Sequence, residues 1–161
     1  MRRFTRVFSL ITVLCIIAVM AIGCTKEPDV IKIGAVMPLT GPLAWLGQQH
    51  RWGLDIAVKD INSEGGINGK RIEIAYEDDG GDPKTAVSAF NLLVLKHNVP
   101  LVFVVMSSSA LAVQPVAEKK QVVLFANVGH PKVAELSKWT FRIFLTSQQE
   151  ASFMAKFCNE S

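Results

Sequence analysis

The sequence has few cysteines and no pair that could form a disulfide framework. Cys15 lies in an apolar segment near the N-terminus, Cys24 follows that segment, and Cys158 is the third and last. Because we expect the first segment to be removed and Cys24 to be modified, no disulfide is predicted within the exported chain. We expect Cys158 to be a buried helix residue. The histidines have no partner at metal-ligand spacing, so no metal site is predicted.

An excess of positive charge is also missing once the N-terminus is set aside. Arg2, Arg3 and Arg6 account for three of the 17 Lys and Arg, which leaves 14 against 14 Asp and Glu. The formal net charge of +3 therefore belongs to the N-terminal segment. The sequence has no basic patch of the kind that would predict a nucleic-acid partner. Internal repeats and low-complexity tracts are absent from the sequence.

Motifs of catalysis are likewise absent. No serine stands in a nucleophile-elbow motif, and no cysteine is paired with a histidine. The glycines of Gly65–Gly69 precede an expected strand, whereas a phosphate-binding loop follows one. The acids Glu77–Asp79, with Asp82, could hold Mg²⁺ or act as an acid and base pair. We interpret them as a solvated loop whose Asp82 caps the next helix, so no catalytic residue, metal or cofactor is predicted.

The first 23 residues have the pattern of a secretory signal of the lipoprotein type. A basic start precedes an apolar run, and small residues stand directly before Cys24. We predict cleavage before Cys24, lipidation of its sulfur, and a polar tether over residues 24–30. The alternative is an uncleaved anchor helix, but about 17 apolar residues are at the short edge of what spans a bilayer. The predicted location is the periplasm or the cell surface, with the protein lipid-anchored to a membrane.

Strands and helices alternate over residues 31–161 with short links between them. This alternation predicts an α/β fold with a doubly wound parallel sheet and right-handed crossovers. Within the first helix we expect Trp45, Trp52 and Ile56 to face the sheet, and Gly53 to mark close packing against a strand. The expected strands are 31–36, 71–77, 101–106, 122–126 and 140–145. The expected helices are 44–62, 83–97, 110–119 after the three serines, and 148 onward, with one helical turn at 133–137.

Three loops that follow strand ends carry groups suited to a small polar ligand. The first loop, 38–47, offers an apolar wall. The second, 107–109, offers serine hydroxyls and free N–H groups at a helix start, and the third, 127–130, offers main-chain donors and acceptors. The carboxyl ends of parallel strands lie at one edge of the sheet, so the loops should converge. Each loop also has a plain structural explanation, as a core aromatic, a helix cap or an ordinary polar loop. The candidate ligand-binding residues are Trp45, Leu46, Ser107, Ser108, Ser109, Asn127, Val128 and Gly129.

Two stretches of the sequence resemble one family, the periplasmic branched-chain amino-acid-binding proteins of ABC importers. They are IKIGAVMPLTGPLAWLG, from Ile31, and MSSSALAVQPVAEKKQVVLFA, from Met106, and the resemblance extends to about Phe157. It implies a type I periplasmic-binding-protein lobe in which a hydroxyl at Ser107 and main-chain groups of residues 127–129 hold the ligand's carboxylate and ammonium. The loop at Trp45–Leu46 would cover the ligand's side chain. The implied partners are a small-molecule ligand and the ABC permease subunits.

The resemblance leaves the ligand and the exact role open. Leu46 and Gly129 depart from the residues usual in leucine-type binders, so a different amino acid, an amide or a small organic acid stays open as the ligand. A ligand-sensing receptor module of the same fold is an alternative role, and an anchored α/β enzyme using the acidic loop is a weaker one.

The length of the chain bounds what it can do alone. The family is more than twice as long, so we expect residues 31–161 to form the N-terminal lobe only, with the second lobe incomplete. Such a product is expected to bind ligand weakly or not at all. Its open sheet edge and apolar surface should also make it prone to aggregate.

Overall fold

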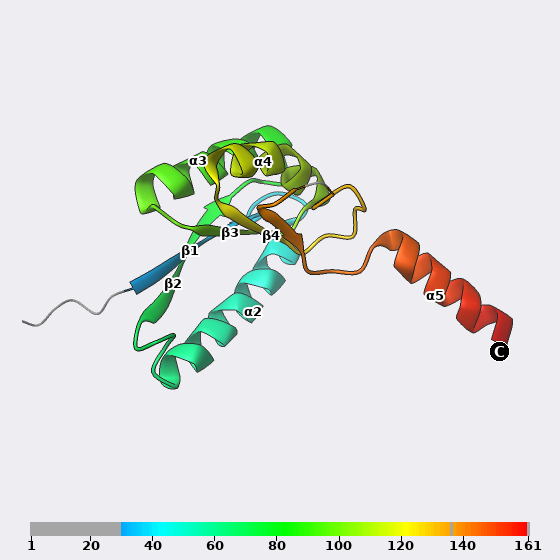
Figure 1. Ribbon diagram of the computed structural model, residues 1–161, viewed down its shortest axis with the longest axis horizontal. Coiled ribbons are helices and arrows are strands. Elements are labelled where there is room, and N and C mark those ends of the chain that lie inside the picture. The colour runs from blue at the N-terminus through cyan, green and yellow to red at the C-terminus, as the bar shows by residue number, and fades with distance from the viewer. Residues whose placement is uncertain (1–29, 136, 161) are drawn as a thin grey trace, which may run out of the picture.

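The computed structural model describes residues 30–135 and 137–160, so the predicted signal, Cys24 and most of the tether lie outside the described residues. Strands and helices alternate along the described chain as the sequence predicts (Figure 1). In chain order they are β1 (Val30–Met37), α2 (Ala44–Ser63), β2 (Arg71–Asp78), α3 (Pro83–His97), β3 (Leu101–Val104), α4 (Ser107–Lys120), β4 (Val123–Ala126), β5 (Thr140–Arg142) and α5 (Ser147–Glu160).

The strands form one parallel sheet in the order β2-β1-β3-β4-β5. This confirms the predicted α/β class with a parallel sheet. From β1 the chain adds β2 on one side and β3 on the other, so the strand order reverses between β1 and β3. Helices α3 and α4 cover one face of the sheet and α2 lies on the other (Figure 1). A crevice is expected where neighbouring crossovers leave to opposite faces.

The larger part of the core lies between the sheet and the pair α3 and α4. Phe90 and Leu93 of α3 and Val113 of α4 are fully buried against alternate strand residues, among them Val104 and Leu124. Alternation explains the pattern, because successive strand side chains point to opposite faces. The other face carries a smaller buried group of Ala35, Met37 and Val105 under α2.

Two strands end earlier than the sequence predicts. Expected strand 101–106 ends at Val104, and expected strand 140–145 ends at Arg142. The last ladder bonds are donated by the N–H of Asn127 to Val104 O and by the N–H of Ile143 to Ala126 O. Beyond these bonds the chain turns off the sheet. The apolar runs in the sequence do not show where the strands end, because the runs continue past β3 and β5 into the loops.

Helix α2 does not bury the face that the sequence predicts. Trp45, Trp52 and Ile56 are 59%, 62% and 61% exposed, so their predicted packing against the sheet is wrong. Gly53 is also not a point of close packing, since a Cβ there would have nothing within 4 Å. The close approach is at Gly47, where a Cβ would lie 1.9 Å from Pro38 O. The helix therefore meets the sheet near its start and leaves its tryptophans outside.

Polar bonds hold the rest of α2 against the edge strand β2. The Asn62 carboxamide donates to Ile72 O at 2.9 Å and accepts from Ile72 N at 2.8 Å. Two turns earlier on α2, Asp55 accepts a hydrogen bond from Tyr76 Oη at 2.6 Å. Burial and then this bond to Asp55 raise the pKa of Tyr76 above its ordinary value. These bonds fix α2 beside β2, in addition to the apolar packing of Leu54.

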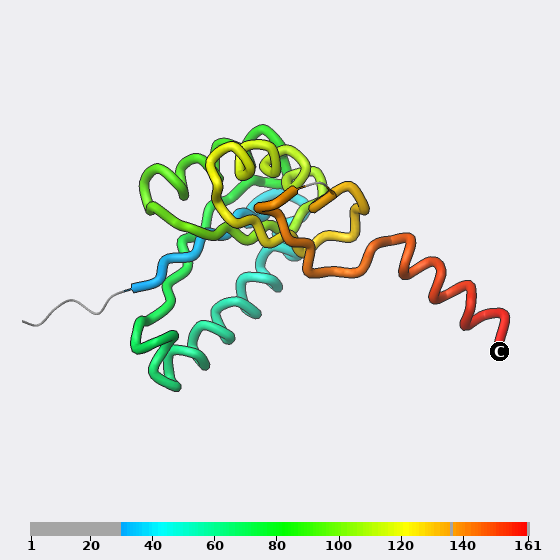
Figure 2. Tube along the Cα trace, viewed as in Figure 1, coloured from blue at the N-terminus to red at the C-terminus, as the bar shows by residue number. Residues whose placement is uncertain are grey.

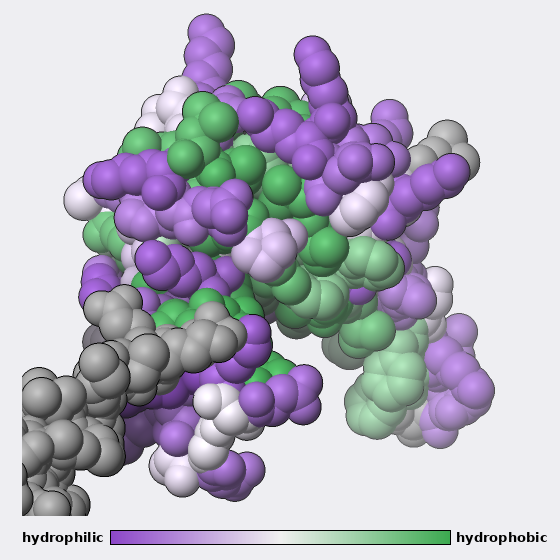
Figure 3. Space-filling view, turned by 60° about the vertical axis from the view of Figure 1, so that its left-hand side comes forward, coloured by the Kyte–Doolittle hydropathy of each residue, from purple (hydrophilic) through white to green (hydrophobic). Residues whose placement is uncertain are grey.

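Apolar surface remains open on the α2 side of the sheet and on α5. Phe103, Phe125 and Phe141 stand in register on β3, β4 and β5, and Phe141 is 49% exposed. The trace leaves the sheet after β5 and continues into α5, which projects away from the sheet (Figure 2). None of the α5 residues is buried, so the expected burial of Cys158 is wrong. The space-filling view shows hydrophobic atoms exposed among polar ones on the face it displays (Figure 3).

Two glycines of α2 make a matched test of this packing. Gly47→Ala should destabilise the protein by about 1 to 3 kcal/mol, because its Cβ would overlap the Pro38 carbonyl and push the helix start away. Gly53→Ala should stabilise it by about 0.5 to 1 kcal/mol, because alanine is the better helix former and the site is open. Urea denaturation midpoints measure both. Equal stability of the two variants would show that α2 does not meet the sheet at Gly47.

Candidate functional site

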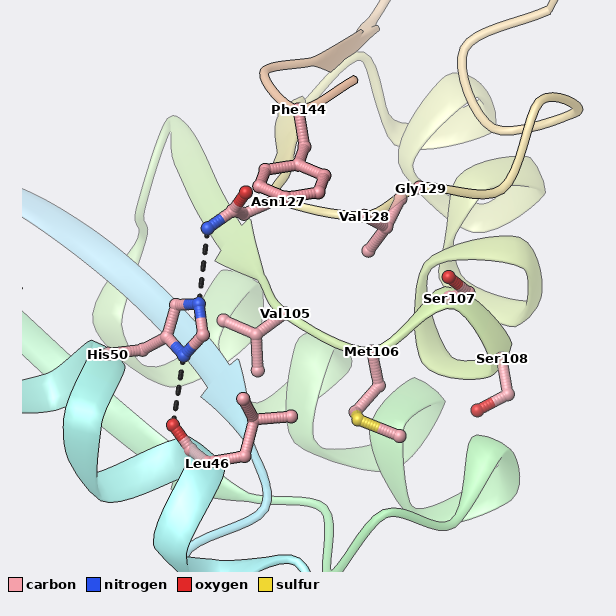
Figure 4. Close-up of a pocket in the computed structure, with 10 residues that line it drawn as sticks. All are labelled: Leu46, His50, Val105, Met106, Ser107, Ser108, Asn127, Val128, Gly129 and Phe144. Atoms are coloured by element: carbon pink, nitrogen blue, oxygen red, sulfur yellow. Dashed lines mark hydrogen bonds between the residues drawn. The ribbon is translucent and has the colours of Figure 1, made fainter. Parts of the chain in front are cut away.

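A cavity of about 520 Å³ lies at the carboxyl edge of the sheet, where the strand order reverses. Its walls come from the start of α2, from the chain after β3, from the loop after β4 and from the chain after β5 (Figure 4). Four separate loops therefore meet around one space, as parallel topology predicts. The lining residues are Leu46, His50, Val105, Met106, Ser107, Ser108, Asn127, Val128, Gly129 and Phe144.

One wall is the first turn of α4. The helix begins at Ser107, and its N-cap Met106 has an extended backbone and makes no side-chain cap hydrogen bond. The first N–H groups of a helix have no partner within the helix, and they carry a partial positive charge. Ser107 and Ser108 both line the cavity. This wall is therefore suited to an anionic group such as a carboxylate.

Ser109 is not on that wall. It is fully buried, and its hydroxyl donates to Asp79 Oδ2 at 2.7 Å. A helix turns by about 100° per residue, so the first and third residues of α4 face different directions. The structure therefore gives Ser109 a position behind the wall and not the ligand contact that the sequence suggested.

The acidic loop after β2 is held by internal hydrogen bonds, and its Asp79 is buried. It is therefore not the solvated loop that the sequence suggested. Asp79 is 1% exposed, and it accepts from the N–H of Gly81 at 2.9 Å as well as from Ser109. Asp82 does cap α3 as predicted, because its carboxylate accepts from Thr85 N at 2.7 Å. The bonds that Asp82 accepts from the N–H and the hydroxyl of Thr85 lower the pKa of Asp82.

Asp78 ties the same loop to the segment between β1 and α2. Its carboxylate accepts from the N–H of Leu39 at 2.7 Å, from the N–H of Gly80 at 2.8 Å and from the Thr40 hydroxyl. Burial alone would raise the pKa of Asp78, but the bonds from Thr40, Gly80 and Leu39 outweigh it and lower the pKa. The tie fixes how the chain enters α2, and with it the position of Leu46.

His50 and Asn127 form the wall opposite the serines (Figure 4). His50 Nδ1 lies 2.9 Å from Leu46 O, and His50 Nε2 lies 3.1 Å from Asn127 Nδ2. The imidazole also packs beside Phe103, with ring centroids 6.4 Å apart. The contact between His50 and Asn127 joins α2 to the loop after β4 across 77 residues of sequence.

The remaining predicted residues are placed unevenly. Leu46, Val128 and Gly129 line the cavity, whereas Trp45 does not and is 59% exposed. Two main-chain groups of the third loop already have partners. The N–H of Asn127 donates to Val104 O at 2.9 Å, and Gly129 O accepts from Ser147 N at 3.1 Å. Part of the main chain that the sequence offered to a ligand is therefore used by the fold.

Sequence reasoning missed four residues of the cavity. Val105, Met106 and Phe144 were assigned to strands, and the early strand ends place them in the walls. His50 was considered only as one of the histidines that have no partner at metal-ligand spacing. A signal for it existed, because it stands four residues after Leu46 and so shares a helix face with it.

Within residues 30–135 and 137–160, no group of His, Cys, Asp and Glu side chains is arranged to hold a metal ion. In the same described chain, no helix has both the length and the apolar character needed to cross a membrane.

Comparison with known proteins gives consistent matches. A family described as "Periplasmic binding protein" matches residues 30–160. The Leu/Ile/Val-binding protein homolog 3 of Brucella melitensis biotype 1 is 34% identical over 129 residues, which are 79% of this chain and 35% of that protein. The chain thus spans about a third of the length of this relative.

Solved structures agree in fold and in coverage. The substrate-binding protein LivJ of a branched-chain amino acid transporter from Streptococcus pneumoniae, in complex with isoleucine, has a TM-score of 0.69 at 28% identity, over 73% of this chain and 34% of that one. A solute-binding protein of an ABC transporter from Rhodopseudomonas palustris BisB5, in complex with 3,4-dihydroxybenzoic acid, has a TM-score of 0.62 at 28% identity, over 73% and 32%.

Adjacent serines of α4 give a test of the wall. Ser109→Ala should destabilise the protein by about 1 to 3 kcal/mol, because Oδ2 of the buried Asp79 carboxylate loses its hydroxyl donor and only the bond from Gly81 N–H to Oδ1 remains. Ser108→Ala, at an exposed position one residue earlier, should change stability by about 0.5 kcal/mol or less. Thermal or urea denaturation compares the two. If Ser108→Ala were the more destabilising change, the assignment of Ser109 as the structural serine would be wrong.

Proposed function

Because this chain belongs to the periplasmic binding protein family, we propose that it is the N-terminal lobe of the extracytoplasmic solute-binding component of an ABC importer. The lobe captures an amino acid or a similar small polar solute. The observation that supports this most is the first turn of α4, which opens into a cavity lined by both polar and apolar groups at the reversal of strand order.

The carboxylate of the solute is the group that this lobe recognises first. The N–H groups at the start of α4, with the hydroxyls of Ser107 and Ser108, form the site for it. Isoleucine and 3,4-dihydroxybenzoic acid, found in the two structural relatives, both carry a carboxyl group. They differ in almost everything else. The family likeness therefore supports a carboxylate in the ligand and leaves the remainder open.

Apolar residues of the cavity take the rest of the solute. Leu46, Val105, Met106 and Phe144 line it between the serine wall and the His50 wall. An apolar lining with a few placed polar groups is typical of small-molecule sites. Trp45 lies outside this lining and is not part of the proposed site.

Closure needs more than this lobe. The chain corresponds to about a third of its relatives' length, and a second lobe would close over the ligand by a hinge motion. The closed form would then present the solute to the permease subunits. Residues 31–161 alone supply one side of the site, so their affinity should be low.

A catalytic role is not part of the proposal. The acids that could have carried one are used by the fold, since Asp79 is buried against Ser109, Asp78 holds the loop before α2, and Asp82 caps α3. A carboxylate already saturated with main-chain donors is poorly placed to move protons for a substrate. Capture without turnover is the simpler role.

Anchoring by Cys24 completes the proposal. The signal pattern and Cys24 lie outside the described residues, so this part rests on the sequence alone. Lipid on Cys24 would keep the protein beside the permease at the membrane surface. The variant Cys24→Ala should still be exported but should no longer be found in the membrane fraction, which cell fractionation measures.

Titration with the L-amino acids tests the proposed function. At millimolar concentration at least one should bind, and Ser107→Ala should lower its affinity about tenfold, the effect of losing a hydrogen bond to a charged group. Calorimetry gives the affinities, and NMR shifts of the labelled protein give the site. Ser88→Ala, an exposed serine on α3, is the matched control. Binding that Ser107→Ala leaves unchanged would contradict the serine wall as the carboxylate site.

A further inference from the structure

We propose that His50 sets which atom Asn127 offers to the cavity, and so makes this site prefer a ligand that carries a hydrogen-bond donor beside its carboxylate end. The inference rests on the proposed function and adds to it a residue that determines specificity. It depends on two contacts, from His50 Nδ1 to Leu46 O at 2.9 Å and from His50 Nε2 to Asn127 Nδ2 at 3.1 Å.

The first contact fixes the tautomer of the imidazole. A main-chain oxygen can only accept, so His50 Nδ1 must carry the proton that reaches Leu46 O. In the neutral ring the other nitrogen, Nε2, then has a free lone pair and can only accept. Leu46 is four residues earlier on the same helix, so α2 itself holds the ring in this state.

The second contact fixes the carboxamide of Asn127. An accepting Nε2 requires a donor, and the only donor of an asparagine side chain is its nitrogen. Asn127 Nδ2 therefore faces His50, and Oδ1 is at the opposite end of the group, on the side of Phe144 (Figure 4). Without His50 the carboxamide could take either orientation, because its two ends are nearly equal in size.

The result is a cavity with opposite polarity at its two walls. The start of α4 offers N–H groups and hydroxyls, which suit a carboxylate. The wall of Asn127 offers a carbonyl-type oxygen held in place by His50, which suits an ammonium or an amide N–H. A solute with a carboxylate alone uses only the first wall. A solute that also carries an ammonium uses both.

Pairs of probes that differ only in the amino group test this preference. L-leucine is paired with 4-methylpentanoate, and 4-aminobutanoate with butanoate, which also varies the distance from the amino group to the carboxylate. For at least one pair, the unmodified protein should bind the amino compound about tenfold more tightly by calorimetry, the scale of one hydrogen bond to a charged group. His50→Phe and Asn127→Leu should each reduce that ratio to about one.

Two further variants separate positioning from simple damage. His50→Gln should retain most of the preference, because one carboxamide can donate to Leu46 O and accept from Asn127 Nδ2. His97→Phe, at the end of α3, is the matched histidine control and should leave the ratio unchanged. A loss of preference in His50→Phe that His50→Gln does not restore would overturn the positioning role.

The tautomer gives a reading that needs no ligand. Nitrogen-15 NMR of the unmodified protein, at a pH where the ring is uncharged, should show the proton of His50 on Nδ1. A proton on Nε2 would overturn the inference whatever binds. If all four probes bind but no amino compound is preferred, the inference fails while the proposed function stands. If none of the probes nor any amino acid binds, the proposed function fails and the preference inferred for its ligand fails with it.

Discussion

The reversal of strand order between β1 and β3 is the constraint on which the rest of the structure depends. Because β2 and β3 flank β1 on opposite sides, α2 leaves to one face of the sheet and α4 packs on the other. The starts of α2 and α4 must then lie on opposite sides of one crevice. Leu46 and His50 reach the crevice from α2, and Ser107 and Ser108 reach it from α4. No local pattern in any one segment would bring these four residues together.

A second layer of bonds keeps the crevice in shape. Asp78 ends the edge strand β2 and Asp79 follows it, yet Asp78 holds the segment before α2 and Asp79 holds α4 through Ser109. Two neighbouring carboxylates therefore connect the two helices that line the cavity. Buried carboxylates are stable only when donors satisfy them. The geometry of the site is therefore sensitive to the loss of the Ser109 hydroxyl, although Ser109 does not line the cavity. It also explains why acids beside a binding cavity here have structural roles.

The sequence was informative about the sheet and less so about the helix faces. Strands β1, β3 and β4 are mostly apolar runs bounded by turn residues, so their type and their order along the chain could be predicted. The faces of α2 could not be predicted, because the periodicity of Trp45, Trp52 and Ile56 marks an apolar stripe without showing whether the described chain holds a partner for it. Ser109 was misplaced because the helix begins at Ser107 and not after the serines, which turns Ser109 inward. The contact of His50 with Asn127 spans 77 residues, beyond the reach of any local signal.

The central claim is that a solute binds at the β1/β3 crevice with its carboxylate at the start of α4. A crystal structure of the protein grown with a bound amino acid tests it most directly. We predict carboxylate oxygens within hydrogen-bond distance of the Ser107 and Ser108 N–H groups, with the rest of the molecule toward Asn127 and Phe144. A ligand seated elsewhere, for example against Thr146, Gln149 and Phe153 at the start of α5, or one whose carboxylate points away from α4, would contradict the account.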